Sequence, residues 1–184
     1  SVTNKEGKGI RGDLIGGLLA SEFLSGSTIV YDIRYSRGVL EYLTQKGLKL
    51  VPSKIGHTLI KRTMKENNAV FCGEGSGHTM YQENFYAEST QLSLFKILKI
   101  LTREKKSIDD LVKPMEKWNL AYEINTPVDG WPGSVPAILE RIEKHYADAT
   151  INKLDGLKVD YPDWWFLLRA SSNDPVIRLI VEAR

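Results

Sequence analysis

The chain has 184 residues, of which 42% are hydrophobic and 26% are charged, and 25 basic residues nearly balance 23 acidic ones to leave a net charge of +2. This composition argues against a disordered chain, and the near-neutral balance argues against a nucleic-acid or membrane surface. Because no apolar run approaches the ~20 residues that cross a membrane and no signal peptide is recognisable, we expect a cytoplasmic protein with no nucleic-acid or membrane partner.

The first two-thirds of the chain alternate between helical and strand patterns. Apolar residues at helical spacing predict a helix from Asp13 to Leu24, with Asp13 as its cap or as an acid in its first turn. Further helices are predicted at residues 37–45, 58–66, 90–103 and 107–117, and strands at residues 28–31, 48–51 and 69–71. Pro52 is expected to end the second strand. This alternation indicates a mostly parallel sheet with ligand loops at the carboxyl ends of its strands.

A glycine-rich motif follows the third of these strands. In residues 71–78, three glycines separate Glu74, Ser76 and His78. Glycine lets the backbone come close to a ligand, a carboxylate can accept hydrogen bonds from two neighbouring hydroxyls, and a serine and a histidine can donate, accept or move a proton. The motif therefore suits a polyol, although a glycine-rich turn with an incidental acid is the alternative. Cys72, the only cysteine, is expected to be a buried thiol at the strand end.

The pattern changes near Trp118. Strands are predicted at residues 120–124, 149–152, 158–161, 165–168 and 176–181, with a helix at 135–146 and an ordinary loop at 125–134. One helix with an antiparallel meander indicates a small α+β domain. We therefore expect two domains, residues 1–117 and 118–184: a mostly parallel-sheet α/β domain followed by a small α+β domain with an antiparallel sheet. Trp164 and Trp165 are expected to be packing residues.

The turn between the last two predicted strands carries the donors that an anion needs. Arg169 offers a planar fork, Ser171, Ser172 and Asn173 add short neutral donors, and backbone N–H groups in a tight turn can form a concave nest. Arg178 is expected either to bind phosphate or to brace the loop. A polar hairpin loop with solvated arginines is the alternative. A phosphate site here and a polyol site in the glycine-rich motif together suggest a sugar phosphate.

Taken in order, these motifs resemble those of the α-D-phosphohexomutase family, which comprises phosphomannomutases and phosphoglucomutases. Gly73–His78 resembles the family's sugar-binding loop Gly-Glu-x-Ser-Gly-His, and Arg169–Arg178 resembles its phosphate loop Arg-x-Ser-x-Thr-x-Pro with an arginine three residues later. Val30–Arg34 is similar to the family's strand ending in Asp-Val-Lys/Arg, and Ile55–Lys61 is similar to its Thr-Gly-His-Ser-x-Ile-Lys segment. Leu157–Trp165 resembles the strand pair that leads into the phosphate loop.

The resemblance implies an enzyme that interconverts hexose 6-phosphate and hexose 1-phosphate through a bisphosphate intermediate, so that a hexose phosphate is the substrate. It implies that the substrate-binding residues are Glu74, Ser76, Arg169, Ser171, Ser172, Asn173 and Arg178. Arg34 and His57 match residues that face the reacting end of the sugar, and His78 is a third catalytic candidate. Simpler roles remain open for the two histidines, as a helix N-terminal residue for His57 and as a turn residue for His78.

Two family motifs do not occur in these 184 residues: the loop with the phosphorylated serine and the Asp-x-Asp-x-Asp-Arg loop that binds magnesium. We therefore expect the third and fourth domains of a four-domain enzyme, inactive alone, with the N-terminal domains of the same enzyme as partner and Mg²⁺ as the cofactor of the full-length protein. No His, Cys and carboxylate spacing predicts a metal site in this chain itself. A catalytically incomplete sugar-phosphate-binding module and an unrelated α/β protein are the alternatives.

Three positions depart from the family pattern. Gly75 stands where the family commonly has Met or Gln, Asn173 stands where it usually has Thr, and Asp174 stands where Glu is common. An amide still donates hydrogen bonds, so we expect retuned phosphate contact and not its loss. The choice among mannose, glucose and glucosamine phosphates stays open.

Overall fold

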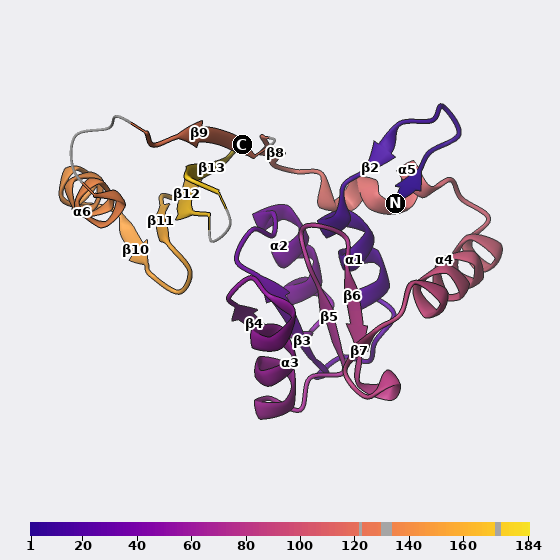
Figure 1. Cartoon of the computed structure of the whole chain (residues 1–184). Helices are drawn as coiled ribbons and strands as arrows, with labels where there is room; N and C mark the ends of the chain where they lie inside the picture. Colours follow the sequence, from indigo (N-terminus) through magenta and orange to yellow (C-terminus); the bar gives the residue numbers. More distant parts are fainter. Residues whose placement is uncertain (122, 130–133, 172–173) are drawn as a thin grey trace. The chain divides into compact units, whose positions relative to one another are not determined.

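The computed structural model describes residues 1–121, 123–129, 134–171 and 174–184, and it divides the chain into two compact units (Figure 1). Unit 1 comprises Ser1–Lys117 and unit 2 comprises Trp118–Arg184. In the described residues, no helix combines the length and the apolar character that a membrane span requires. Each unit has its own sheet.

Unit 1 is built on a five-stranded sheet in the order β4-β3-β5-β6-β7. Strand β3 (Thr28–Asp32) pairs in parallel with both β4 (Lys49–Ser53) and β5 (Phe71–Gly73). Strands β6 (Thr79–Tyr81) and β7 (Ala87–Glu88) extend the sheet in antiparallel pairing. The remaining elements are the pair β1 (Val2–Thr3) and β2 (Gly9–Ile10), the helices α1 (Gly12–Ala20), α2 (Arg37–Gln45), α3 (His57–Glu66), α4 (Thr90–Glu104) and α5 (Ile108–Val112), and the 3₁₀ turns Gln82–Asn84 and Lys113–Met115.

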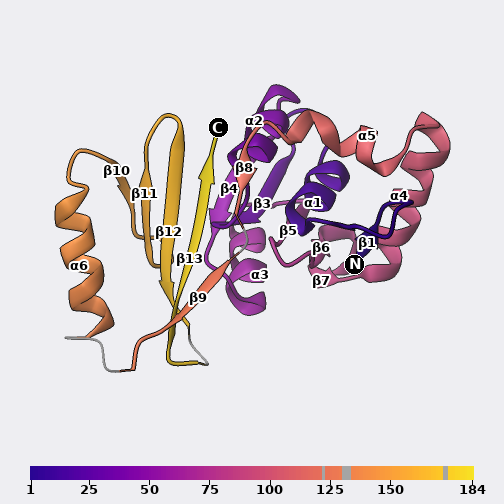
Figure 2. The ribbon, with the colours of Figure 1, turned by 90° about the horizontal axis from the view of Figure 1, so that it is seen from above.

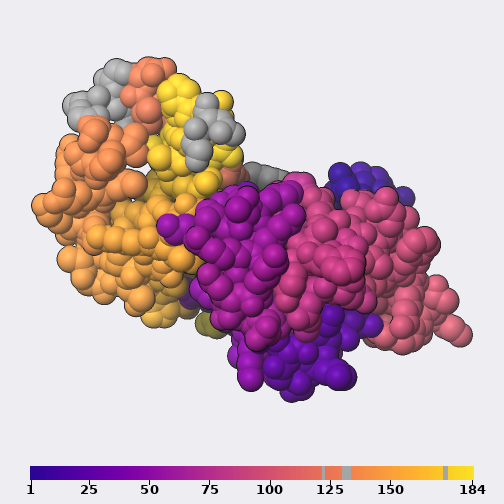
Figure 3. Space-filling view, turned by 60° about the horizontal axis from the view of Figure 1, so that its bottom comes forward, coloured from indigo at the N-terminus to yellow at the C-terminus, as the bar shows by residue number. Residues whose placement is uncertain are grey.

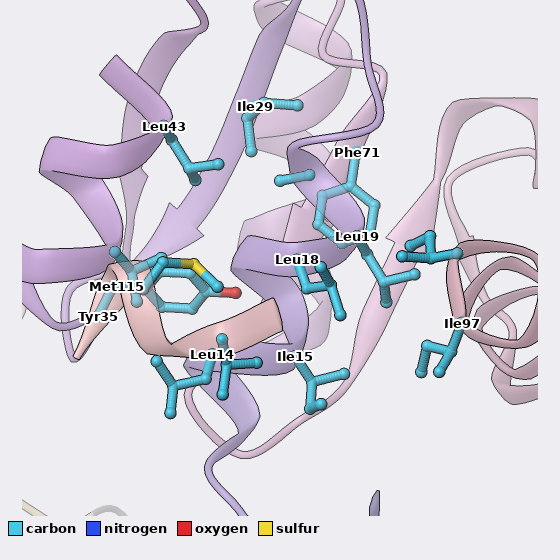
Figure 4. Close-up of a cluster of buried hydrophobic side chains, with 14 of the residues drawn as sticks. Leu14, Ile15, Leu18, Leu19, Ile29, Tyr35, Leu43, Phe71, Ile97 and Met115 are labelled. Carbon is cyan, nitrogen blue, oxygen red and sulfur yellow. The ribbon is translucent and has the colours of Figure 1, made fainter. Parts of the chain in front are cut away.

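The sheet of unit 1 has an apolar core on each face, because neighbouring side chains of a strand point to opposite sides. Ile29 and Phe71 pack with residues of α1, α2 and α4, among them Leu18, Leu43 and Ile97 (Figure 4). Val30 and Cys72 pack on the other face with Ile60 and Met64 of α3. The result is a helix, sheet and helix sandwich. Figure 3 shows purple and magenta residues, from the middle of the unit 1 sequence, lying side by side on one face of unit 1.

Several predicted boundaries in unit 1 are wrong for identifiable reasons. Helix α1 ends at Ala20, and Leu24, which the helical spacing included, is 83% exposed. Strand β4 runs through Pro52, and it can do so because it lies at the edge of the sheet, where a missing N–H is tolerated. Strand β5 begins two residues later than expected, at Phe71. The helix predicted at 107–117 is divided into α5 and a 3₁₀ turn that contains Pro114.

Unit 2 is an antiparallel sheet covered by one helix (Figure 2). The sheet has the order β10-β11-β12-β13-β8, and β9 also pairs with β13. Its strands are β8 (Asn119–Leu120), β9 (Ile124–Pro127), β10 (Thr150–Asn152), β11 (Leu157–Asp160), β12 (Trp164–Ala170) and β13 (Val176–Ala183). Helix α6 (Val135–His145) contributes Leu139 and Ile142 to a cluster with Val159 and Phe166 of the sheet.

The two units confirm the predicted fold class, a mixed but mostly parallel α/β sheet followed by an antiparallel-sheet domain. The strand predicted at 120–124 is instead two short strands, β8 and β9. Strand β9 also takes the first residues of the predicted loop 125–134, because residues 124–127 pair with β13.

Candidate functional site

The glycine-rich motif is the turn of the hairpin between β5 and β6. The Glu74 N–H donates to the His78 carbonyl oxygen at 2.9 Å, and the Gly77 N–H donates to the Glu74 carbonyl oxygen at 2.8 Å. Gly77 has φ +93°, a conformation that favours glycine. The first residue of α1, Gly12, lies against the turn so closely that a Cβ there would be 2.7 Å from the Gly75 carbonyl oxygen. The turn is thus fixed by its own hydrogen bonds and by the start of α1.

Asp32, at the carboxyl end of β3, holds the turn and Arg34 together. Its fully buried carboxylate accepts the Gly75 N–H at 2.8 Å, the Arg34 backbone N–H at 2.8 Å and the Arg34 Nη2 at 2.6 Å. Arg34 is thereby held with Nη2 3.9 Å from Glu74 Oε2. We did not predict Asp32 as a site residue. Its sequence signals are an acid that ends an apolar strand two residues before an arginine and its place in the Val30–Arg34 segment that resembles the family motif.

Glu74 is the buried centre of the site. Its side chain is 5% exposed, and its Oε1 has no hydrogen-bond partner among the described residues. The His57 Nε2, from the first residue of α3, lies 3.6 Å from that Oε1. The other oxygen, Oε2, accepts the Ser76 hydroxyl at 3.3 Å. A buried carboxylate oxygen with no donor is one that a ligand hydroxyl or a cation can satisfy.

The two histidines converge on Glu74 from different elements. His78 Nδ1 lies 2.9 Å from Ser76 Oγ, and the rings of His57 and His78 meet edge to face with centroids 5.2 Å apart. His57, Glu74 and His78 offer ligand atoms that all lie within 4.8 Å of one another. These three residues come from a helix start and from a hairpin turn, so no local spacing in the sequence signals their grouping.

Glu88 of β7 completes the polar cluster, and we did not predict it. Its Oε2 lies 4.0 Å from His57 Nε2 and its Oε1 lies 3.9 Å from His78 Nε2. A cavity of about 740 Å³ adjoins the cluster and is lined by Ser76, His78 and Glu88 and by Leu94 of α4. Its size falls in the range of small-molecule pockets, roughly 300–1,000 Å³. Five predicted residues, Arg34, His57, Glu74, Ser76 and His78, are therefore grouped at one place in unit 1.

In unit 2, the predicted phosphate loop joins β12 to β13, and Arg169 is the last residue but one of β12. Arg169 Nε donates to Asp155 Oδ2 at 3.1 Å, with both side chains largely buried. This ion pair fixes the guanidinium at the base of the loop. Ser172 and Asn173 lie outside the described residues.

Arg178 of β13 is held by contacts on both sides of its guanidinium. Nη1 donates to Glu123 Oε1 at 3.0 Å, and Nη2 donates to Ser171 Oγ at 3.2 Å and lies 3.5 Å from Asp174 Oδ2. Of the two roles left open for Arg178, these contacts favour the bracing one. Phosphate binding by Ser171 and Arg178 stays a prediction.

Cys72 is buried in β5, as predicted. Burial raises the pKa of its thiol well above the ordinary value, and the nearby carboxylates of Glu74 and Asp32 raise it further. Because the thiolate is the reactive form, the structure favours an inert packing residue next to the site.

Comparison with known proteins gives a consistent result. The sequence model of the family described as phosphoglucomutase/phosphomannomutase, alpha/beta/alpha domain III, matches residues 11–118. A phosphomannomutase of Methanocaldococcus jannaschii is 36% identical over an aligned length of 185 residues, which covers 99% of this chain and 40% of that protein. The chain thus spans about 40% of the length of curated relatives such as this one.

Solved structures agree with these sequence matches. A phosphoglucomutase/phosphomannomutase family protein of Burkholderia thailandensis is 27% identical with a TM-score of 0.79, and the match covers 98% of this chain and 39% of that one. An Aspergillus fumigatus N-acetylphosphoglucosamine mutase, solved with GlcNAc-6P and magnesium, is 14% identical with a TM-score of 0.62, and the match covers 94% of this chain and 43% of that one. Because the identity to the A. fumigatus mutase is only 14%, this similarity concerns the fold alone.

Proposed function

Because the chain belongs to the α-D-phosphohexomutase family, as a C-terminal portion that includes domain III, we propose that it forms the substrate-binding part of an enzyme that interconverts hexose 6-phosphate and hexose 1-phosphate. The reaction would pass through a bisphosphate. The observation that carries the proposal is the buried, unpartnered Glu74 Oε1, in the same turn as Ser76 and His78, which line a cavity of substrate size. Vicinal ring hydroxyls can donate to a carboxylate placed in this way.

In this proposal, unit 1 holds the sugar ring. Glu74 and Ser76 bind the ring hydroxyls, and the preformed turn keeps both side chains in place before the ligand arrives. Arg34, held by Asp32, supplies positive charge near the transferring phosphoryl group, where charge develops in the transition state. His57 and His78 are the groups that can move a proton to or from the reacting hydroxyl.

Unit 2 would bind the phosphate that does not react. Arg169 supplies the charged donor, and Ser171, Ser172 and Asn173 add neutral ones, while Arg178 braces the loop from β13. A guanidinium whose Nε is occupied by Asp155 still has its Nη groups to offer to phosphate oxygens.

The phosphorylated serine and the metal-binding loop of the enzyme do not occur in these 184 residues. We therefore assign phosphoryl transfer and metal binding to other parts of the full-length enzyme. The full-length enzyme would use Mg²⁺, the ion present in the solved A. fumigatus mutase. The 184-residue chain alone should then give no turnover above background in a coupled mutase assay. Turnover by the isolated chain would contradict this division of labour. The cytoplasmic location and the N-terminal domains as partner remain predictions.

Calorimetric titration with mannose 1-phosphate and glucose 1-phosphate tests the binding role. Glu74→Gln keeps the shape of the side chain but halves its acceptors, so we expect at least about tenfold weaker binding, since a hydrogen bond to a charged group contributes roughly 1.5–3 kcal/mol. Arg169→Ala should weaken binding similarly. Glu66→Gln, an exposed change on α3, is the matched control and should bind like the wild type. Equal affinity of Glu74→Gln and wild type would contradict the proposal.

A further inference from the structure

We propose that His57, Glu74 and His78 form a binding site for Zn²⁺ or a similar first-row transition ion, separate in kind from the magnesium chemistry of the full-length enzyme. Imidazole nitrogens and carboxylate oxygens are usual zinc ligands, and in this site they lie within 4.8 Å of one another. Ligands at about 2.0–2.2 Å from a tetrahedral ion are roughly 3.3–3.6 Å apart. The 3.6 Å between His57 Nε2 and Glu74 Oε1 already fits that spacing.

His78, the third ligand, can reach the ion by a rotation of its side chain, without a change in the backbone. The His57 and His78 side chains are 49% and 45% exposed, so each ring can turn about its side-chain bonds, while Glu74 is fixed by burial. The site therefore has one rigid anionic ligand and two adjustable neutral ones. Turning a half-exposed ring meets little resistance, because close packing is a property of the interior.

The unpartnered Glu74 Oε1, which the proposed function gives to a ring hydroxyl, can instead take a cation, so the ion and the sugar would compete for it. A buried carboxylate oxygen without a donor costs free energy unless something satisfies it, and a cation beside His57 would do so. The positive charge of Arg34 does not prevent this. Its guanidinium is paired with the buried Asp32 at 2.6 Å and approaches the other oxygen, Oε2, only to 3.9 Å.

The hydrogen bonds around His78 already suit a metal-binding imidazole. If His78 presents Nε2 to the ion, its Nδ1–H donates to Ser76 Oγ at 2.9 Å, and the Ser76 hydroxyl donates to Glu74 Oε2 at 3.3 Å. Such outer hydrogen bonds fix the tautomer and the orientation of metal-binding histidines. Because the Ser76 hydroxyl donates to Glu74 Oε2, the other oxygen, Oε1, is the one that can bind the ion.

Glu88 supplies the charge balance. Its Oε2 lies 4.0 Å from His57 Nε2 and its Oε1 lies 3.9 Å from His78 Nε2, so it can reach the ion through a water molecule. Two carboxylates and two neutral imidazoles match the charge of a divalent ion. Mg²⁺ prefers six oxygen ligands and gives up its water reluctantly, so the two imidazoles should select zinc over magnesium.

Titration of the tag-free chain with Zn²⁺, followed by calorimetry and by the visible absorption of Co²⁺ as a substitute, tests this site. The chain has three histidines, and the third, His145 of α6, is the matched control. We expect one ion per chain, at least about tenfold weaker binding in both His57→Ala and His78→Ala, and unchanged binding in His145→Ala, because losing a ligand or its support typically costs 10–100-fold in affinity. Circular dichroism must show that each variant is folded.

Three results would overturn the inference: wild-type affinity in His57→Ala or His78→Ala, an equal loss in His145→Ala, or equally effective competition by Mg²⁺. The buried Cys72, the only cysteine, is not a competing ligand in the native chain. Zinc binding does not rest on the proposed function. A chain that binds Zn²⁺ but no hexose phosphate would support the zinc site and contradict the proposed function. A chain that binds hexose phosphate but no Zn²⁺ would contradict the zinc site and support the proposed function.

Discussion

Replacing Asp32 with asparagine should loosen the glycine-rich turn, whichever way the new amide is oriented. Each carboxylate oxygen accepts one backbone N–H, Oδ1 from Arg34 at 2.8 Å and Oδ2 from Gly75 at 2.8 Å. Asparagine has only one oxygen. Its NH₂ group must therefore face one of these two N–H donors, and the ion pair with the Arg34 guanidinium is lost as well.

The expected cost follows from these contacts. An unsatisfied buried N–H costs roughly 1–3 kcal/mol, and a hydrogen bond to a charged group contributes roughly 1.5–3 kcal/mol. The Arg34 guanidinium can turn partly toward solvent, so the loss should be near the lower end of these two costs added together. We expect the free energy of unfolding of unit 1 to fall by about 3 kcal/mol. With a urea dependence of about 2 kcal/mol per molar, the midpoint should fall by about 1.5 M.

Urea unfolding followed by far-ultraviolet circular dichroism measures this loss, and hydrogen exchange at the Gly75 and Arg34 amides locates it. Asp163→Asn is the matched control, because Asp163 and its partner Arg184 are 3.5 Å apart and mostly exposed. An exposed pair contributes roughly 0–1 kcal/mol, so the control should barely move. A change below about 0.5 kcal/mol in Asp32→Asn, or an equal change in the control, would show that Asp32 does not hold the turn.

Three further experiments test other parts of the structure. Since burial raises the pKa of the Cys72 thiol, disulfide reagents at pH 8 should react at least about tenfold more slowly with the native chain than with the urea-unfolded chain; equal rates would contradict its burial. Gly12→Ala should lower the free energy of unfolding by about 1–3 kcal/mol, because its Cβ would lie 2.7 Å from a carbonyl oxygen of the turn, whereas Gly9→Ala, with nothing within 4 Å, should not. The hydrogen bond from Arg103 lowers the pKa of Glu22, so this pair stabilises the fold above the ordinary carboxyl pKa near 4.5, and the stabilisation is lost as the pH falls below that value. When the free energy of unfolding is measured at decreasing pH, it should therefore fall less in Arg103→Ala than in the wild type. An equal fall in both proteins would contradict the role of the pair.

The predictable elements are those whose signals are local. Helix α2 runs from Arg37 to Gln45 as predicted, because Ser36 caps its start through the Gly38 N–H and a glycine with positive φ follows its end at Gly47. Strands β6 and β7 have only three and two residues, too few to show a period, and their existence depends on pairing with β5.

The same division applies to the site. Glu74, Ser76 and His78 could be predicted because glycines space them within one short segment. The role of Asp32 could not, since the N–H that it accepts from Gly75 lies 43 residues away in the chain. Glu88 was missed for a similar reason, because its place beside the two histidines depends on the position of β7 next to β6.

We propose that one sugar phosphate binds both the turn at residues 74–78 and the loop at residues 169–178. Amide chemical shifts measured by nuclear magnetic resonance during a titration test this proposal. Titration with glucose 1-phosphate should shift amides of both segments with one common dissociation constant, while inorganic phosphate should shift only those of the loop. Shifts in one segment without the other, or different dissociation constants for the two, would contradict the account.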